Sequence, residues 1–228
     1  MRNKAYWTEQ LGEKWALNLK DILRDPYMNK LMDFVALEYA MRTIYPADQK
    51  DVFKSFKLCP WDDVKVVIIG KEVGFHTGIF PLPYSDDYIH TFHNGSLNKI
   101  SSCIEREYYG GLNLDFDYSL EHWMQQGILF LNTAMTVERG KSGSHIKPWK
   151  KFYEAVIHQI KEYKPGTIFL LWGDEAMEQS DKLENQHVFS WESPHIASLE
   201  RRDWNCPNFK QVDTLMEHLY GTGNTIKW

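Results

Sequence analysis

The chain has 228 residues, a length that suits one sizeable domain with a single core. Hydrophobic residues make up 43% and charged residues 25%, which is the balance of a water-soluble globular protein and excludes a disordered or membrane-spanning one. The net charge of −5 excludes a generally basic nucleic-acid coat, so any DNA binding needs a local basic face.

The cysteines indicate the compartment. Cys59, Cys103 and Cys206 are odd in number, widely spaced and without a CxxC pair, which fits a reducing cytoplasm and argues against a disulfide framework or a zinc ribbon. No apolar run of about 20 residues occurs, and the first residues lack the apolar region of a signal peptide. We therefore expect a cytoplasmic protein without a membrane partner.

The first part of the chain is predicted to be helical. Apolar residues recur at helical spacing over residues 7–45. Pro26 divides this stretch and is expected to open its second helix, because proline is favoured at the first helical position. Tyr45-Pro46 then ends the helical stretch.

Beyond residue 63, apolar runs alternate with helical patterns. Strands are expected over 64–69, 128–131, 167–172 and 187–191, helices over 97–108, 120–126, 149–163, 175–184 and 209–220, and a loop over 70–95. This alternation predicts one α/β domain spanning 1–228, a three-layer sandwich with a central, mostly parallel four-stranded sheet flanked by helices. Ligand sites on such sheets lie outside the carboxyl ends of the strands, which converge on one crevice.

An amide side chain ends one of these strands. The run from Gly127 to Val137 is apolar except for Asn132 and two threonines. An amide can both donate to a carbonyl and accept from an N–H, so the single side chain of Asn132 can read a polar edge of a ligand. The alternative is a strand-end asparagine that caps a loop.

Several motifs, in chain order, resemble those of family 1 uracil-DNA glycosylases. They are Ile44-Tyr45-Pro46 with Asp51-Val52-Phe53, the run 63–70 that leads into the first loop, the Asn132 strand followed by Ser144-His145, Leu170-Leu171-Trp172-Gly173, and the final residues 224–228. The resemblance covers nearly the whole chain and implies the fold of that family. Fold alone does not give function, so the site residues must decide it.

The first loop departs from the family pattern Gly-Gln-Asp-Pro-Tyr-His. Here it reads Gly70-Lys71-Glu72-Val73-Gly74-Phe75-His76. The resemblance implies that Glu72 replaces the Asp that orients the attacking water, and its extra methylene displaces that water by about 1 Å, an error that can cost roughly 100-fold in rate. Gly74 stands where a Tyr closes the pocket against a C5 substituent. Either the pocket is open to a bulky C5 group or the loop no longer has a base to gate.

The resemblance also gives a stacking platform for the base. Tyr84, within Pro83-Tyr84-Ser85, corresponds to the family's aromatic residue against the flipped base, and tyrosine can serve there. The alternative is a plain core aromatic. The predicted base-binding set is thus Gly74, Tyr84 and Asn132.

The last loop departs further from the family's His-Pro-Ser-Pro-Leu-Ser. Ser193 stands in place of the His that stabilises the charge developing on the base, and losing such a donor typically costs about 100- to 1,000-fold. Ala197 stands in place of the Leu that wedges into the duplex, and it is too small to hold a base step apart. His195 could swing into the catalytic role, or be an ordinary surface or core-capping histidine. The predicted catalytic set, degenerate by this comparison, is Glu72, Ser193 and His195.

Further residues are candidates for contacts with the DNA backbone. By resemblance these are Ser96, Ser144, His145, Ala197, Ser198, Arg201, Arg202 and Trp204. The serines could equally cap turns or helices, and the arginines could belong to a solvated face. His90 and His93 form a possible metal pair without a further ligand at suitable spacing, so no metal and no cofactor are expected.

Two functions remain open at this point. In the first, the changes at Glu72, Ser193 and Ala197 abolish uracil excision, since about 2 kcal/mol each would lower the rate by orders of magnitude. The protein would then bind duplex or single-stranded DNA as a replication accessory or a partner of a DNA polymerase, as poxvirus relatives do, or bind a protein without touching DNA. In the second, it is an active glycosylase for a hydroxymethylated or glycosylated pyrimidine. The altered loops also favour a viral source, with the host cytoplasm as its location.

Overall fold

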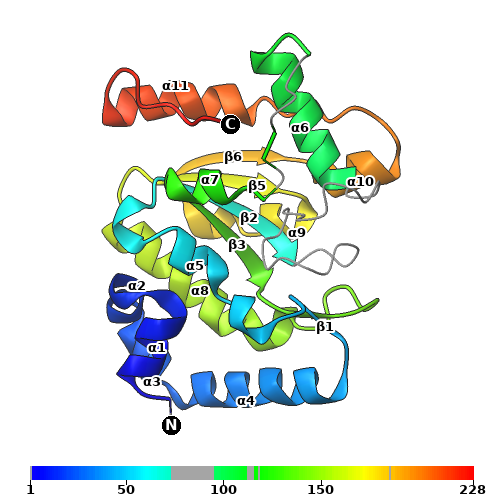
Figure 1. The fold of residues 1–228 in the computed structure, drawn as a ribbon. Coiled ribbons are helices and arrows are strands. Elements are labelled where there is room, and N and C mark those ends of the chain that lie inside the picture. The colour runs from blue at the N-terminus through cyan, green and yellow to red at the C-terminus, as the bar shows by residue number, and fades with distance from the viewer. Residues whose placement is uncertain (1, 73–94, 112–115, 118, 185) are drawn as a thin grey trace.

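A four-stranded sheet forms the centre of the computed structural model, which describes residues 2–72, 95–111, 116–117, 119–184 and 186–228 (Figure 1). Its strands, in the order β3-β2-β5-β6, are β2 (Val66–Glu72), β3 (Ile128–Ala134), β5 (Ile168–Trp172) and β6 (His187–Trp191). All neighbours pair in parallel, so the four carboxyl ends reach the same edge of the sheet.

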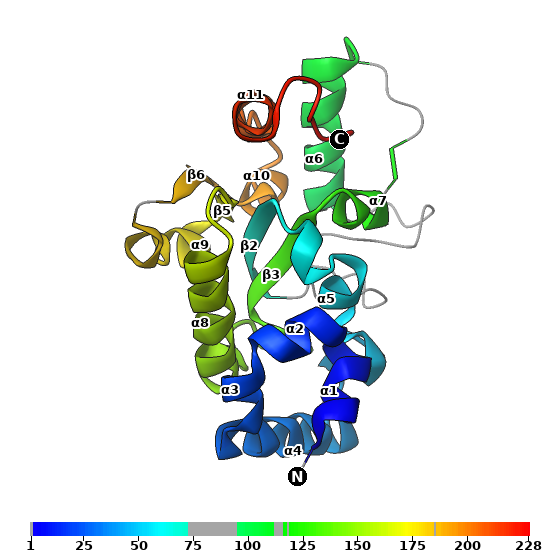
Figure 2. The same ribbon diagram turned by 90° about the vertical axis from the view of Figure 1, so that its left-hand side faces the viewer.

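Helices cover both faces of the sheet (Figures 1 and 2). On one side lie α6 (Gly95–Tyr108), α7 (Glu121–Gln125), α10 (Pro194–Leu199) and α11 (Asn208–Tyr220). On the other lie α1 (Lys4–Leu11), α2 (Glu13–Asn18), α3 (Lys20–Arg24), α4 (Pro26–Met41), α5 (Lys54–Leu58) and α8 (Ile146–Tyr163). The predicted three-layer α/β sandwich with a parallel four-stranded sheet is confirmed.

Apolar runs explain the strands β2, β3 and β5. Every residue of β3 and β5 is buried, as are the first five of β2, which is typical of strands covered by helices on both faces. By contrast, β6 is partly exposed, although β3, the other edge strand, is buried throughout. Gly127 precedes β3 with φ +98°, and a Cβ there would lie 2.2 Å from the Asp63 carbonyl oxygen, so only glycine permits this approach.

The predicted helix boundaries agree closely with the structure at several points. Pro26 is the first residue of α4, and the Asp25 side chain caps this helix by accepting a hydrogen bond from the Tyr27 N–H at 2.8 Å. The helices expected over 97–108, 149–163 and 209–220 begin one to three residues earlier than predicted and end where predicted.

Other local predictions were wrong. The loop expected from Gly70 begins later, because β2 continues to Glu72 alongside β3. The single helix expected over 175–184 is α9 (Asp174–Met177) followed by the 3-10 turn η3 (Ser180–Leu183). Two short strands, β1 (Ile44–Tyr45) and β4 (Val137–Glu138), pair in antiparallel fashion and were not predicted.

Aromatic side chains fill the core. Five tryptophans are less than 2% exposed: Trp15, Trp123, Trp149, Trp172 and Trp204. Edge-to-face ring pairs connect the helices to one another, as between Phe56 of α5 and Phe152 of α8. Within the described part of the chain, no helix has both the length and the apolar character that crossing a bilayer requires.

Candidate active site

Asn132 lies near the carboxyl end of β3, where sequence reasoning placed it. The side chain is only 3% exposed, and its Oδ1 has no hydrogen-bond partner among the described residues. A buried polar atom left unpaired costs about 1–3 kcal/mol, so such atoms are rare and need a reason. The arrangement therefore holds one unused acceptor at the carboxyl edge of the sheet.

Glu72 is the last residue of β2 and faces the same side of the sheet as Asn132. The register pairs Gly70 with Asn132 and Glu72 with Ala134, and side chains two apart on a strand share a face. The carboxylate of Glu72 accepts hydrogen bonds from the Ser142 hydroxyl at 2.5 Å and the Gly143 N–H at 2.7 Å. Asn132 and Glu72 thus share one face of the sheet near its carboxyl end, and the turn that contains Ser142 and Gly143 holds the carboxylate.

Lys71, the neighbour of Glu72 on β2, lies at the same edge of the sheet and was not singled out from the sequence. Its ammonium forms an ion pair with Glu175 of α9, and its carbonyl accepts a hydrogen bond from the Thr133 hydroxyl at 2.7 Å. Burial is the largest single effect on Glu175 and raises its pKa, but the hydrogen bond and charge of Lys71, together with a backbone hydrogen bond, leave the pKa lowered overall. The sequence did contain a signal for this ion pair. Lys71 lies near the end of one strand, and Glu175 follows Gly173 at the end of another strand.

Ser193 lies beyond β6 at the same edge. Gly173, which follows β5, has φ +103° and donates its N–H to the Trp191 carbonyl at 2.9 Å. A Cβ on Gly173 would lie 3.1 Å from the Cβ of Ser193, so the two turns are closely packed. The Ser193 carbonyl accepts from the Ile196 and Ala197 N–H groups and opens α10, the helix on which His195 and Ser198 also lie.

The predicted wedge position, Ala197, is fully buried within α10, which packs against α6. The same helix exposes two larger apolar side chains, Ile196 (42% exposed) and Leu199 (65%). Sequence reasoning treated these residues as a loop and overlooked that a proline at position 194 can begin a helix. We therefore replace Ala197 by Ile196 and Leu199 as the apolar surface near the site.

Two further predicted DNA contacts belong to the interior. His145 is 2% exposed, and its ring nitrogens lie 2.8 Å from the Thr136 hydroxyl and 3.4 Å from a Glu38 carboxylate oxygen. Trp204 is 1% exposed, packs edge-to-face on Trp172, and donates its indole N–H to the Glu192 carbonyl at 3.0 Å. Neither side chain has surface to offer DNA, so both are corrected to packing roles.

The remaining predicted phosphate contacts differ in how free they are. Ser96 is buried in the first turn of α6, and the Ser144 hydroxyl accepts the Glu138 N–H at 3.0 Å. Arg202 forms ion pairs with Glu192 and Glu200. Its hydrogen bonds lower the pKa of Glu192, and this effect is larger than the opposing effect of burial. Arg201 is exposed and has no ion pair within the described chain.

Some predictions cannot be placed. Gly74 and Tyr84 lie outside the described residues, as do His90 and His93. Among the residues that are described, no group of three or more His, Cys, Asp or Glu side chains is arranged to hold a metal ion.

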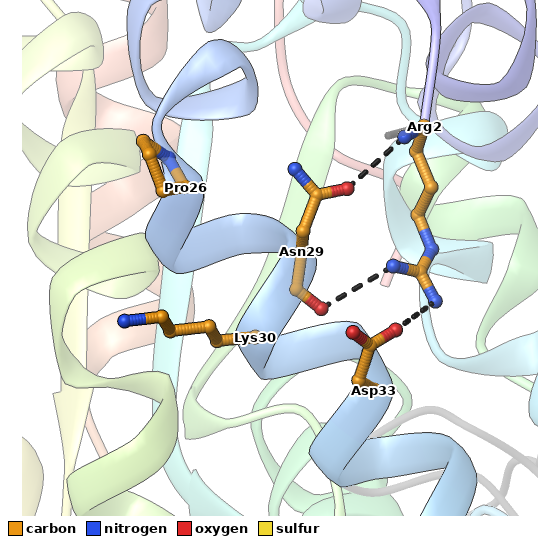
Figure 3. Close-up of a pocket in the computed structure, with 5 residues that line it drawn as sticks. All are labelled: Arg2, Pro26, Asn29, Lys30 and Asp33. Atoms are coloured by element: carbon orange, nitrogen blue, oxygen red, sulfur yellow. Dashed lines mark hydrogen bonds and ion pairs between the residues drawn. The ribbon is translucent and has the colours of Figure 1, made fainter.

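A pocket elsewhere in the molecule is a weaker candidate (Figure 3). It lies between the N-terminal residues and α4 and is lined by Arg2, Pro26, Asn29, Lys30 and Asp33. Arg2 already bonds within it, to Asp33 at 3.1 Å and to both the side chain and the carbonyl of Asn29. Its polar groups mainly satisfy one another, whereas Oδ1 of Asn132 has no hydrogen-bond partner in the described chain.

The comparisons with known proteins identify the family to which this chain belongs. Residues 56–219 match the sequence model of the Uracil DNA glycosylase superfamily. The chain belongs to that family.

Named relatives extend over almost the full length. The chain is 32% identical over 229 residues to a uracil-DNA glycosylase of Coxiella burnetii, covering 95% of this chain and 94% of the relative. It is 33% identical over 204 residues to a uracil-DNA glycosylase of Proteus mirabilis, covering 84% and 85%.

Solved structures agree on the fold. Mimivirus uracil-DNA glycosylase superposes with a TM-score of 0.70 at 19% identity, covering 85% of this chain and 71% of that one. The enzyme from Nitratifractor salsuginis gives 0.62 at 18% identity, covering 86% and 90%.

These relatives do not support the prediction that glycosylase activity has been lost, since the full-length relatives carry the enzyme's name. The predicted viral source, cytoplasmic location and polymerase partner stay predictions.

Proposed function

We propose that this protein is a DNA glycosylase that holds an extruded pyrimidine against Asn132 and hydrolyses its N-glycosidic bond. The single observation that carries the proposal is the buried Oδ1 of Asn132 without a partner in the described chain. An amide held there at a cost of about 1–3 kcal/mol becomes satisfied when a ring N–H donates to it. The relatives named uracil-DNA glycosylase add support.

Glu72 is the carboxylate that orients the attacking water in this proposal. A carboxylate offers about four lone-pair sites, and the described contacts with Ser142 and Gly143 use two of them. The two donors fix the carboxylate while capacity remains to accept from a water molecule. Ser193, packed at Gly173, lies on the far side of the sheet edge and replaces a histidine by a weaker donor.

The preferred base carries a substituent at C5. Gly74 stands at the position that, by family resemblance, closes the pocket against such groups, and glycine has no side chain to do so. The longer side chain of Glu72 and the hydroxyl of Ser193 both argue for weak uracil excision. Hydroxymethylated and glycosylated pyrimidines are the substrates that this combination favours.

A second function has one specific observation in its favour. Glu72 is already engaged by Ser142 and Gly143, and a carboxylate with both donors in place could be structural. The protein would then bind DNA and an extruded base without releasing it, and act as a replication factor beside a DNA polymerase.

One experiment separates these functions. Oligonucleotides of matched sequence would contain uracil, 5-hydroxymethyluracil or 5-hydroxymethylcytosine, and base release and binding would be followed in parallel. Release from a C5-modified substrate that disappears in Asn132→Ala, but persists in the exposed control Asn98→Ala, supports the glycosylase. Binding without release from any substrate supports the second function and rejects the first.

A further inference from the structure

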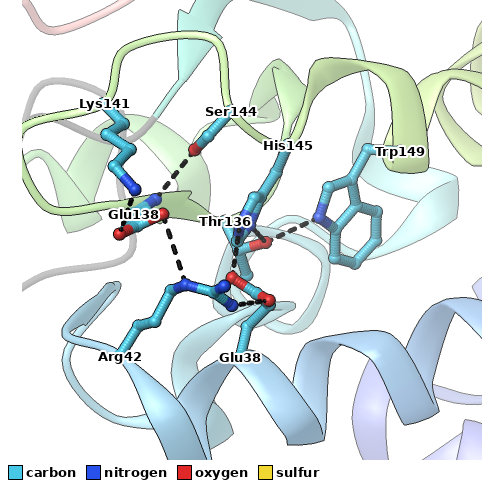
Figure 4. Close-up of polar contacts among 8 residues, drawn as sticks. All are labelled: Glu38, Arg42, Thr136, Glu138, Lys141, Ser144, His145 and Trp149. Atoms are coloured by element: carbon cyan, nitrogen blue, oxygen red, sulfur yellow. Dashed lines mark hydrogen bonds and ion pairs between the residues drawn. The ribbon is translucent and has the colours of Figure 1, made fainter.

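A buried chain of polar contacts links α4 to α8 behind the site (Figure 4). The Trp149 indole N–H donates to the Thr136 hydroxyl at 2.7 Å, and that hydroxyl lies 2.8 Å from Nδ1 of His145. Nε2 of the same ring lies 3.4 Å from Glu38 Oε2. The contacts thus run from α8 through the end of the β3 segment to α4, which precedes the part of the chain matched by the family.

The chemistry of the groups fixes the direction of these bonds. An indole N–H can only donate and a carboxylate can only accept. Nε2 of His145 must therefore carry the proton that goes to Glu38, so Nδ1 of the neutral ring accepts from the Thr136 hydroxyl. The indole N–H and the Thr136 hydroxyl thus each meet an acceptor within 2.8 Å, and Nε2–H of His145 faces the Glu38 carboxylate at 3.4 Å.

The surroundings of His145 keep the ring neutral and fixed. Burial lowers its pKa, against the opposing effect of Glu38 and Glu138, and Arg42 also lowers it. Phe34 packs edge-to-face on the imidazole with ring centres 5.0 Å apart. Among charged groups, Arg42 pairs with both Glu38 and Glu138.

The same chain fixes the loop that holds Glu72. Between β4 and α8, the Lys141 N–H donates to the Glu138 carbonyl at 3.0 Å, and the Ser144 hydroxyl accepts the Glu138 N–H. Ser142 and Gly143 lie inside this turn, and both donate to Glu72. His145 immediately follows the turn, so its anchorage decides where those two donors lie.

We infer that Glu38, His145 and Thr136 form a positioning device that places the donors of Ser142 and Gly143 on Glu72. The inference rests on the proposed function for its catalytic meaning, though the placement itself does not. All three residues are buried, and they act on Glu72 through the turn.

The test compares Glu38→Ala with the conservative variant Glu38→Gln, whose amide oxygen still accepts from Nε2–H. Amide hydrogen exchange at Gly143 reports the bond to Glu72 without any substrate. We expect exchange to accelerate on the order of 10-fold or more in Glu38→Ala and to be largely restored in Glu38→Gln. Asp33→Ala, on the exposed side of α4, is the matched control and should leave it unchanged.

Activity provides the second readout. On the substrate found to be cleaved, kcat should fall on the order of 10- to 100-fold in Glu38→Ala while KM changes little, because the carboxylate rather than the base pocket has moved. Thr136→Val interrupts the chain at its other end and serves if Glu38→Ala does not fold. Unchanged Gly143 exchange in both variants would overturn the inference. Absence of base release by the unmodified protein would reject the proposed function alone.

Discussion

The two sides of the sheet edge are built in contrasting ways. On the β2–β3 side, Asn132 is buried and Glu72 is held by a turn that a buried polar chain anchors. On the β6 side, the strand is partly exposed and the helix that follows presents Ile196 and Leu199 to solvent. Under the proposed function, base recognition would be fixed by the core, whereas contact with the duplex would use a surface that can change without disturbing the fold.

The largest expected effect concerns the buried side. Asn132→Ala should lower base release by about 100- to 1,000-fold, the usual cost of losing one preorganised polar group at a reaction centre. Since Oδ1 has no partner in the described chain, Asn132→Leu should abolish release while leaving the free energy of unfolding equal or higher. Single-turnover assays and denaturant unfolding measure the two quantities.

This prediction separates two roles of Asn132, because a base-binding amide affects base release whereas a structural amide affects the free energy of unfolding. If Asn132→Leu instead destabilises the protein by several kcal/mol, then the amide is a structural cap and the comparison of the two sides fails. Asn98→Ala, on the exposed face of α6, should alter neither quantity.

The polar chain behind the site should show the next largest effect. His145→Ala removes a buried ring that packs on Phe34 and leaves Thr136 and Glu38 without that partner. We expect a loss of about 2–4 kcal/mol in the free energy of unfolding. His158, exposed on α8, provides the matched control, and His158→Ala should stay within about 0.5 kcal/mol of the parent.

The pH dependence of stability follows from the same ring. Burial lowers the pKa of His145 in the folded protein. As the pH falls below about 6.5, this histidine therefore takes up a proton in the unfolded chain before it does so in the folded chain. The free energy of unfolding should therefore be highest above that pH. At lower pH it should decrease by at most about 1.4 kcal/mol per pH unit for one proton. Denaturant titrations between about pH 5 and pH 7 measure how the free energy of unfolding changes with pH. This range spans roughly two units around the ordinary histidine pKa.

The control for this window is the same variant. His145→Ala should be less stable overall yet flatter with pH across it. Carboxyl groups with lowered pKa, such as Glu175 and Glu192, lose their contribution only as the pH falls further, toward the ordinary carboxyl range. An equal slope in His145→Ala would assign the effect to other groups.

The sequence predicted the buried side better than the exposed side, for physical reasons. Fully buried strands are continuous apolar runs, so β3 and the amide near its carboxyl end stand out. His145 and Trp204 were wrongly predicted to contact DNA, because residue type alone does not tell whether a histidine or tryptophan is exposed or buried. Their burial depends on contacts with Glu38 and Trp172, which are distant in the sequence. The short helix α10 was missed because six residues carry too little periodicity to distinguish a helix from a loop.

A smaller effect is expected on the exposed side. Ile196→Ala and Leu199→Ala should each weaken duplex binding by about 1 kcal/mol, because an apolar side chain contributes by resting on or between bases. Unfolding should be unaffected, as should binding in Leu17→Ala, an exposed leucine on α2. Equilibrium binding to a labelled duplex measures the change.

Ala197→Leu provides the opposing variant. If Ala197 were the duplex wedge, a leucine there would improve binding. Because Ala197 is fully buried against α6, we expect instead a loss of stability of about 1–3 kcal/mol from overpacking. Tighter binding without destabilisation would restore the role predicted from sequence.

The smallest effect distinguishes two neighbouring arginines. Arg201 is exposed and without an ion pair in the described chain, whereas Glu192 and Glu200 neutralise Arg202. A free cation that contacts phosphate releases a counterion, so Arg201→Ala should reduce the slope of log affinity against log salt by about 1. Arg202→Ala should leave that slope nearly unchanged, because two carboxylates already neutralise the charge of Arg202. Binding measured across a salt series tests both, and equal slopes in the two variants would mean that DNA binding breaks the ion pairs of Arg202 and recruits it to the backbone.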